Sequence, residues 1–395
     1  HRDPLGHTTQ FRYDKVGRRT EVIQPLAGGR NLTTTFGFLP NGWLETITDP
    51  EGGVTTFTYD RDGRRAAVID QEGARTQFTY DAEGRLASHQ DPSGHVTSFL
   101  YGAPGSGLDG LLVGIEYPSF LDEYRYDQRG RRTQTIRVLP ARHGQPERRE
   151  TTVHGFDPRG LRASETDPAQ RTTQYRYDGL GRLAALVDPA QGETLHGYDL
   201  ADNLVALTDA KGQTHRFTYD RAGRRTRHVN PGGDAIVFAY DREGRLTERL
   251  APGGERRAYR YDAAGQLEEE RHFAPGASSP EQVITYAHDP AGRLIGYNQV
   301  GLVDSSAAYT LNGLGQILEE ALTYGRGAEA VELSLGATFR ANGQKASQRY
   351  PGGVELAFGF DQGNRLVRQA LPDGNEISYD GFDWAGPTRI EGPGI

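Results

Sequence analysis

The sequence predicts an all-β fold, a continuous spiralling antiparallel sheet of repeated hairpins that forms a hollow shell or a wide barrel-like wall. Three observations support this prediction. Tyr or Phe followed by Asp recurs throughout the chain, and turn-forming residues stand at both ends of the strands between these copies. The composition is also polar for a chain of 395 residues, with 35% hydrophobic residues and a mean hydropathy of -0.68. The 52 glycines, roughly 13% of the chain against a usual 7% or so, indicate many turns.

The repeat is the first element to justify, because internal repetition decides the architecture. The clear copies begin at Tyr59, Tyr80, Phe156, Tyr177, Tyr198, Tyr219, Tyr240, Tyr261 and Phe360, with a constant step of 21 residues from Tyr177 to Tyr261. Looser copies begin at Tyr13, Phe38, Tyr101, Tyr126, His288, Leu311, Phe339 and Phe382. Longer steps mark loop insertions at 139–150, 273–282 and 324–331. We expect one domain over residues 1–395, an array of about 17 hairpin units excised from a larger protein.

Each unit contains two turn signals, seen most clearly in residues 59–80, where Asp60–Gly63 and Asp70–Gly73 flank a short strand. The Asp side chain can bond the backbone ahead of it, and the Gly tolerates a positive φ. A turn of this kind commonly connects the strands of a hairpin. The predicted structural signature of the repeat is Tyr59, Asp60, Gly63, Tyr80, Asp81, Gly84, Tyr177, Asp178, Gly181, Tyr219, Asp220, Gly223, Tyr240, Asp241 and Gly244.

The strands show the alternation expected of β-structure. Thr76, Phe78 and Tyr80 fall on one face, and Arg75, Gln77 and Thr79 fall on the other. In the outgoing strand 182–187 only Leu183 can be assigned to a face. No segment has both good caps and a sustained helical period, so we expect no substantial helix.

The number of strands predicts an enclosed space. Seventeen hairpins give roughly 34 strands, which would span on the order of 160 Å if they lay flat at about 4.8 Å each. Open twisted sheets rarely exceed about ten strands, so this sheet must coil or close. A sandwich needs two strongly apolar inner faces, and a propeller blade needs about twice the observed period. The architecture that remains possible is a wide wall of strands with a polar and aromatic interior.

The repeat resembles the YD motif of the Rhs/YD-repeat family, on the sequences YDAEGRL from Tyr80, YDRAGRR from Tyr219 and YDREGRL from Tyr240. That family includes bacterial Rhs effectors, the C components of insecticidal toxin complexes, wall-associated bacterial proteins and teneurins. The resemblance covers about residues 11–390 and implies a spiralling β-shell, which in bacterial members encloses a C-terminal toxin. The sequence ends in IEGPGI without the family's DPxGL-type autoproteolytic motif. Asp380 and Asp383 do not match that motif, so no catalytic role is assigned to them.

The leading functional hypothesis is a non-enzymatic scaffold. The chain would be the encapsulating shell of a secreted polymorphic toxin, and it would enclose a C-terminal toxin or cargo domain that lies outside this sequence. The expected partners are that toxin domain and the flanking plug or secretion domains of the parent protein. Export by a bacterial secretion system, or association with the cell surface, would follow. The alternative is an extracellular repeat module that binds carbohydrate or a cell-surface partner through ladders of Tyr and Arg.

Charge and composition exclude several other classes. The net charge of -8 argues against a general nucleic-acid binder. The absence of cysteine excludes disulfides, thiolate metal sites and thiol nucleophiles. Apolar runs are short, such as LLVGI at 111–115, so no membrane span is expected.

The candidates for chemistry are weak, and we expect no catalytic, cofactor-binding or metal-binding residues. Asp60 and Asp70 should lie at opposite ends of a strand, which is unsuitable for an acid–base pair. His196 and His215 should lie two strand spacings apart, too far to share an ion. GSGLDG at 105–110 lacks the following helix of a dinucleotide site.

Two further sets of residues have structural explanations. The arginines that follow the turn glycines should bond nearby Asp or carbonyl groups rather than a specific anion; they are Arg64, Arg85, Arg182, Arg224, Arg245 and Arg293. Trp43 and Trp384 are expected to be packing anchors rather than sugar platforms.

Overall fold

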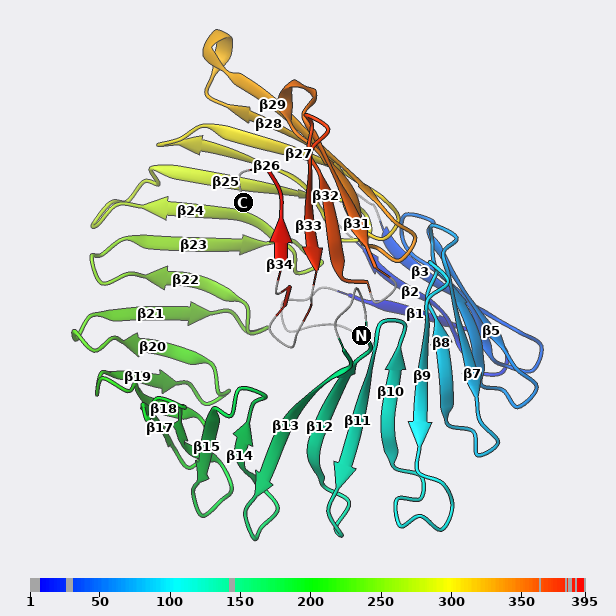
Figure 1. Cartoon of the computed structure of the whole chain (residues 1–395). Helices are drawn as coiled ribbons and strands as arrows, with labels where there is room; N and C mark the ends of the chain where they lie inside the picture. The colour runs from blue at the N-terminus through cyan, green and yellow to red at the C-terminus, as the bar shows by residue number, and fades with distance from the viewer. Residues whose placement is uncertain are drawn as a thin grey trace. The chain divides into compact units, whose positions relative to one another are not determined.

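The protein is almost entirely β-structure. The computed structural model describes residues 8–25, 31–141, 146–361, 364–380, 382, 386–387 and 389–393. They form a 34-stranded antiparallel sheet (Figure 1). Helical structure in the described residues amounts to two single 3₁₀ turns, η2 (Gly327–Glu329) and η3 (Pro351–Gly353). The predictions of an all-β class and a continuous antiparallel sheet of hairpins are therefore confirmed.

The strands are short and regularly spaced along the chain. In the first half they are β1 (Gln10–Tyr13), β2 (Arg19–Pro25), β3 (Asn31–Phe38), β4 (Leu44–Thr48), β5 (Val54–Tyr59), β6 (Arg65–Ile69), β7 (Arg75–Tyr80), β8 (Leu86–Gln90), β9 (Val96–Tyr101), β10 (Leu112–Tyr117), β11 (Phe120–Tyr126), β12 (Arg132–Leu139), β13 (Arg148–Phe156), β14 (Arg162–Thr166), β15 (Thr172–Tyr177), β16 (Leu183–Val187) and β17 (Glu193–Tyr198). In the second half they are β18 (Leu204–Thr208), β19 (Thr214–Tyr219), β20 (Arg225–Val229), β21 (Ala235–Tyr240), β22 (Leu246–Leu250), β23 (Arg256–Tyr261), β24 (Leu267–Phe273), β25 (Gln282–His288), β26 (Leu294–Gly301), β27 (Ser305–Leu311), β28 (Ile317–Tyr324), β29 (Val331–Phe339), β30 (Lys345–Arg349), β31 (Glu355–Phe360), β32 (Leu366–Ala370), β33 (Glu376–Asp380) and β34 (Arg389–Glu391).

Strand pairing follows the order of the sequence, and the strand ladders are antiparallel. The hairpin β15–β16 is typical, with Tyr175 opposite Leu186 and Arg176 opposite Ala185. The register then shifts by one residue, so that Tyr177 faces Leu183. The same shift occurs at Tyr198 in β17–β18 and at Tyr219 in β19–β20. Such a bulge increases the local twist and redirects the chain at the repeated tyrosine.

The chain divides into two compact units. Unit 1 comprises residues 1–78, 91–93 and 236–357, and unit 2 comprises residues 79–90, 94–235 and 358–395. Unit 1 therefore contains β1–β6 and β22–β30, and unit 2 contains β8–β20 and β32–β34, whereas β7, β21 and β31 each have residues in both units.

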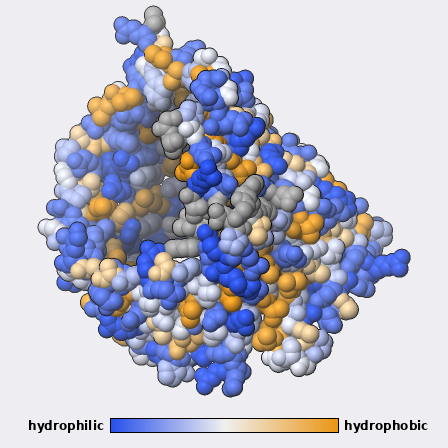
Figure 2. Space-filling view, viewed as in Figure 1, coloured by the Kyte–Doolittle hydropathy of each residue, from blue (hydrophilic) through white to orange (hydrophobic). Residues whose placement is uncertain are grey.

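Burial in the sheet is shallow. No large side chain in the described residues is fully buried, and the buried hydrophobic residues are scattered among strands, such as Phe57 in β5, Ile136 in β12 and Val187 in β16. In the view of Figure 2, hydrophilic residues predominate and hydrophobic residues are dispersed among them. In keeping with the low hydrophobic content, the described residues do not form a thick apolar core.

The two faces of the sheet nevertheless differ. In β7, Thr76, Phe78 and Tyr80 are half-buried, whereas the alternate residues are exposed, as the alternation predicts. We call the face that carries the repeated tyrosines the tyrosine face. It also carries aromatic residues two positions before each tyrosine, such as Phe78 in β7 and Phe217 in β19.

Candidate functional site

The most regular feature of the molecule is the turn that follows each repeated tyrosine. In the copy at Tyr59 the Asp60 amide donates to the Arg64 carbonyl at 2.9 Å, and the Gly63 amide donates to the Asp60 carbonyl at 3.2 Å. One carboxylate oxygen of Asp60 accepts the amides of Asp62 and Arg64, both at 2.9 Å. Gly63 has a φ of +83°, which glycine adopts without strain. The carboxylate therefore closes a turn that the glycine permits.

The other predicted copies have the same geometry. Their aspartates accept the amide of the residue four positions later at 2.8–3.0 Å. Their glycines have φ values between +76° and +86°. These residues are Asp81 with Gly84, Asp178 with Gly181, Asp220 with Gly223, and Asp241 with Gly244. The second turn of a unit is built similarly, since Asp70 accepts the amides of Glu72 and Ala74.

The arginine after the glycine also bonds to the turn. The Arg64 Nε donates to the second carboxylate oxygen of Asp60 at 2.7 Å, and Arg182 makes the same contact with Asp178. The backbone and guanidinium hydrogen bonds from Arg182 lower the pKa of Asp178. These pairs are half-buried, and every oxygen of the carboxylate is used within its own turn. An acid–base catalytic role is poorly supported by carboxylates occupied in this way.

The tyrosine reaches back to the preceding repeat. The Tyr198 hydroxyl donates to the Leu183 carbonyl at 3.0 Å, and the Arg182 guanidinium lies 4.8 Å from the centre of the Tyr198 ring. Tyr261 is held in the same way by Leu246 and Arg245. The hydroxyl bond recurs at Tyr59, Tyr101, Tyr126, Tyr177 and Tyr219. Neighbouring repeats are therefore joined by a tyrosine–arginine clamp in addition to their strand ladders.

Trp43 occupies the arginine position of this clamp. Its ring centre lies 5.1 Å from that of Tyr59, and a Cβ atom added at Gly63 would come within 2.6 Å of its indole. An aromatic ring can take the place of the guanidinium because both groups are planar and can lie against a tyrosine ring. Trp384 lies outside the described residues.

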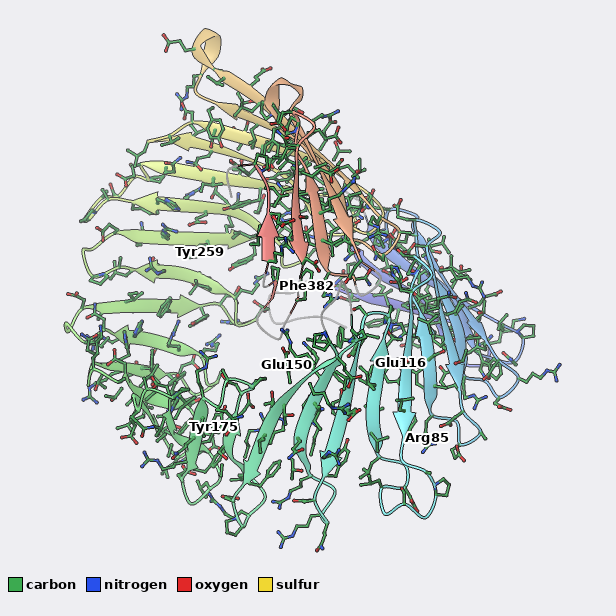
Figure 3. The ribbon with its side chains drawn as sticks, in the orientation of Figure 1. Arg85, Glu116, Glu150, Tyr175, Tyr259 and Phe382 are labelled. Carbon is green, nitrogen blue, oxygen red and sulfur yellow. The ribbon has the colours of Figure 1, made fainter. Side chains whose placement is uncertain are left out.

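Unit 2 contains a shallow polar cavity of about 460 Å³ beside the start of β13. Its lining includes Arg148, Glu150 and Gln170. The Glu150 side chain is only 9% exposed and pairs with Arg148 at 3.0 Å, and Arg148 also donates to the Phe382 carbonyl at 3.2 Å. Figure 3 labels Glu150 and Phe382 in this region. The contact joins segments 234 residues apart within unit 2.

The sequence motifs considered for nucleotide binding and autoproteolysis lie in separate parts of the chain. GSGLDG lies in the loop between β9 and β10, where Asp109 accepts the Ser106 amide and is not followed by a helix. Asp380 ends β33, and Asp383 is outside the described residues. No group of three or more potential metal ligands gathers within the described ranges.

The histidines are placed differently from expectation in one respect. His196 and His215 are separated by Leu207 of β18, as expected. The partner of His215 is instead His228 of β20, with 2.9 Å between ring nitrogens. His228 is not predicted from the sequence, because it does not occupy the position equivalent to His215 in a successive unit. The hairpin register, which brings His228 opposite Phe217, would have revealed it.

In the part of the chain that the structure describes, no helix has the length and apolar character needed to cross a membrane.

Comparisons with known proteins agree with this architecture. The RHS Repeat family model matches residues 38–74 and 59–97, and the Teneurin YD-shell model matches residues 161–309. These matches confirm the resemblance to the Rhs/YD-repeat family that the YD motif predicts. A search of curated proteins found no match.

Several solved structures share the fold. The Photorhabdus luminescens Tc holotoxin pore with a mutant TccC3 is 13% identical with a TM-score of 0.59, and the match covers 96% of this chain and 25% of that one. The crystal structure of TcdB2-TccC3 is 13% identical with a TM-score of 0.56, covering 94% of this chain and 26% of that one. TcdB2-TccC3 without its hypervariable C-terminal region is 14% identical with a TM-score of 0.53, covering 95% and 23%. This chain thus spans about a quarter of the length of these proteins. The likeness to these structures shows that this chain shares their fold, and the Teneurin YD-shell model matches its central part.

Proposed function

We propose that this chain forms part of the wall of an encapsulating shell in a secreted polymorphic toxin, and that the shell encloses a toxin domain of the parent protein. The observation that carries the proposal is the 34-stranded sheet, in which no large side chain of the described residues is fully buried. A sheet with so little apolar packing on its faces can turn one face toward an enclosed chain and the other toward solvent.

The accessible surface supports this interpretation. It measures 22977 Å² for a chain of 43.4 kDa. A compact monomer of that mass exposes roughly 15,000 Å². The excess, about half as much again, is expected when strands pair edge to edge without a packed second layer. The tyrosine clamp and the turns then replace the stabilisation that an apolar core would supply.

The repeated residues form the structural signature on which this wall depends. In the proposal, Tyr59, Asp60 and Gly63 and their equivalents close the hairpins and connect each repeat to the one before it. None of them is assigned to catalysis, and no cofactor is required. The toxin domain is the first proposed partner, and the toxin complexes with the same fold support it. Flanking plug or secretion domains of the parent protein are proposed as further partners.

The proposed localisation is outside the producing cell, through a bacterial secretion system or on the cell surface. A protein of similar fold is part of a toxin complex, which supports this proposal. Enclosure would keep a toxic domain away from the producing cell until delivery.

The test is electron microscopy of the intact parent protein, combined with limited proteolysis. We expect density inside a wall, and a toxin domain resistant to protease while the wall is folded. Unfolding the wall with denaturant should make the toxin domain as sensitive as the same domain expressed alone. An empty, open rod with a freely cleaved downstream domain would contradict the proposal. Micromolar glycan binding that disappears on replacement of exposed tyrosines would favour the binding module instead.

A further inference from the structure

Two histidines meet on the tyrosine face of unit 2. His215 lies in β19 and His228 lies in β20, diagonal to each other across the hairpin because Phe217 is directly opposite His228. The Nδ1 of His215 and the Nε2 of His228 are 2.9 Å apart, and the ring centres are 5.1 Å apart. The two imidazoles therefore point ring nitrogens at the same small volume.

The distance between these nitrogens suits two ligands of one metal ion. For metal–nitrogen bonds of about 2.0–2.1 Å, two imidazole nitrogens are separated by roughly 2.9 Å at a right angle and roughly 3.3 Å at the tetrahedral angle. The observed spacing lies at the first value. Binding would require both lone pairs to face the ion, so the proton of the present hydrogen bond would move to the outer nitrogen of its own ring.

The surroundings hold the rings in place, and they favour the neutral form of His228. Phe217 stacks on His228 with ring centres 4.8 Å apart, and Leu207 lies opposite His215. Burial lowers the pKa of His228, and the neighbouring His215 and Arg225 act in the same direction. Neutral imidazole is the form that binds metal. The Arg225 guanidinium lies 5.7 Å from the Phe217 ring.

We propose that His215 and His228 form a two-histidine site for a divalent transition-metal ion, with water completing the coordination. Imidazole pairs suit copper, nickel and zinc rather than calcium or magnesium. The site cross-links β19 to β20, so an ion bound there stabilises this hairpin of unit 2.

The test uses the tag-free 395-residue chain titrated with Ni²⁺ at pH 7.5 by calorimetry, and again with Cu²⁺. We expect a site that binds Cu²⁺ more tightly than Ni²⁺, following the general order for nitrogen ligands. His215→Ala and His228→Ala should each weaken binding at least tenfold. His196→Ala is the matched control, because His196 lies on the same face two strands away from His215, and it should leave the affinity unchanged.

A second measurement avoids dependence on the variants' folding. Substoichiometric Cu²⁺ should broaden the NMR signals of the His215 and His228 rings of the unmodified chain before those of His196. The metal should also raise the melting temperature of the unmodified chain but not of His215→Ala. Equal broadening of all three rings, or equal Ni²⁺ affinity in the unmodified chain and both alanine variants, would overturn the proposal.

Discussion

At the residue scale, the turn glycine and aspartate have distinct tasks that the sequence already indicates. The glycine supplies a positive φ, and the aspartate accepts backbone amides across the turn. Gln170, Gln191, Asp202 and Asn364 adopt positive φ in the described turns, so unbranched side chains are tolerated there. The requirement is therefore conformational and strongest against β-branched residues.

We expect Gly244→Val to destabilise the protein by about 1–2 kcal/mol, because Gly244 has a φ of +86° and valine is strained in that region. Gly244→Asn should cost less, as asparagine visits this region more readily. Thermal or urea unfolding measures the difference. Gly179→Ala, at a turn glycine with open space around it, is the control. Equal stability of the valine variant and the control would show that the turn geometry is wrong.

The arginine of the turn could be predicted only in part. Its bond to aspartate follows from proximity in sequence, whereas its stacking on a tyrosine 16 residues later depends on the register of two hairpins, as with Arg182 and Tyr198. The contact of Trp43 with Tyr59 could likewise not be predicted, because the local sequence does not show which ring a tryptophan in the arginine position will contact.

At the element scale, the hairpin is the unit of structure and the clamp is the link between units. Turn signals and alternation predict the hairpins well, since both are local properties of the chain. They do not predict the bulge that shifts the register at Tyr177 or Tyr198, because the extra residue is determined by pairing with the partner strand. The outgoing strands were hard to assign for this reason.

Tyr198→Phe should destabilise the protein by about 0.5–1.5 kcal/mol, because it removes the hydroxyl bond to the Leu183 carbonyl and keeps the ring. Tyr198→Leu should cost more, since the contact with Arg182 is also lost. A double-mutant cycle with Arg182→Gln should give a coupling energy with leucine that is absent with phenylalanine. Tyr13→Phe, at a residue 60% exposed, should have no effect. Additive effects of Arg182→Gln and Tyr198→Leu would rule out the clamp.

At the scale of the whole molecule, stability is distributed over many similar small contributions rather than concentrated in a core. The class, the strand count and the resemblance to shell proteins followed from the sequence. Contacts between distant segments did not, because repetition in sequence gives no information about which non-neighbouring turns meet. In unit 1 the Gly313 amide donates to Glu72 at 2.6 Å, across 241 residues.

Acid should weaken the molecule cumulatively. Hydrogen bonds from the arginines lower the pKa of Asp127, Asp178 and Asp220. Unfolded aspartates titrate near pH 4, so the stability from these groups is complete above about pH 5 and is lost as the pH falls through their native values. Urea unfolding at pH 5, 4 and 3 measures the loss. Asp178→Asn should show a shallower decline. A constant free energy of unfolding from pH 5 to pH 3 would contradict the charged turns.

The distant contact in unit 1 should be locally important. Glu72→Ala removes the acceptor of the Gly313 amide, so hydrogen exchange should rise in the turn at residues 312–316 with little change in melting temperature. Glu51→Ala is the control, because Glu51 has the same position in the turn between β4 and β5 as Glu72 has in its own turn. Unchanged exchange at Gly313 would mean that the contact adds no protection.

Each clamp tyrosine contacts the hairpin that precedes it in the sequence, so the contacts between repeats run from the C-terminal repeat to the N-terminal one. Each ring depends on a carbonyl and a guanidinium that were translated about 15 residues earlier. During synthesis, the partners of each clamp tyrosine have therefore already left the ribosome when the tyrosine emerges. The hairpins can then fold one after another in the order in which they are translated. Folding of the early hairpins therefore need not wait for synthesis of the C-terminus.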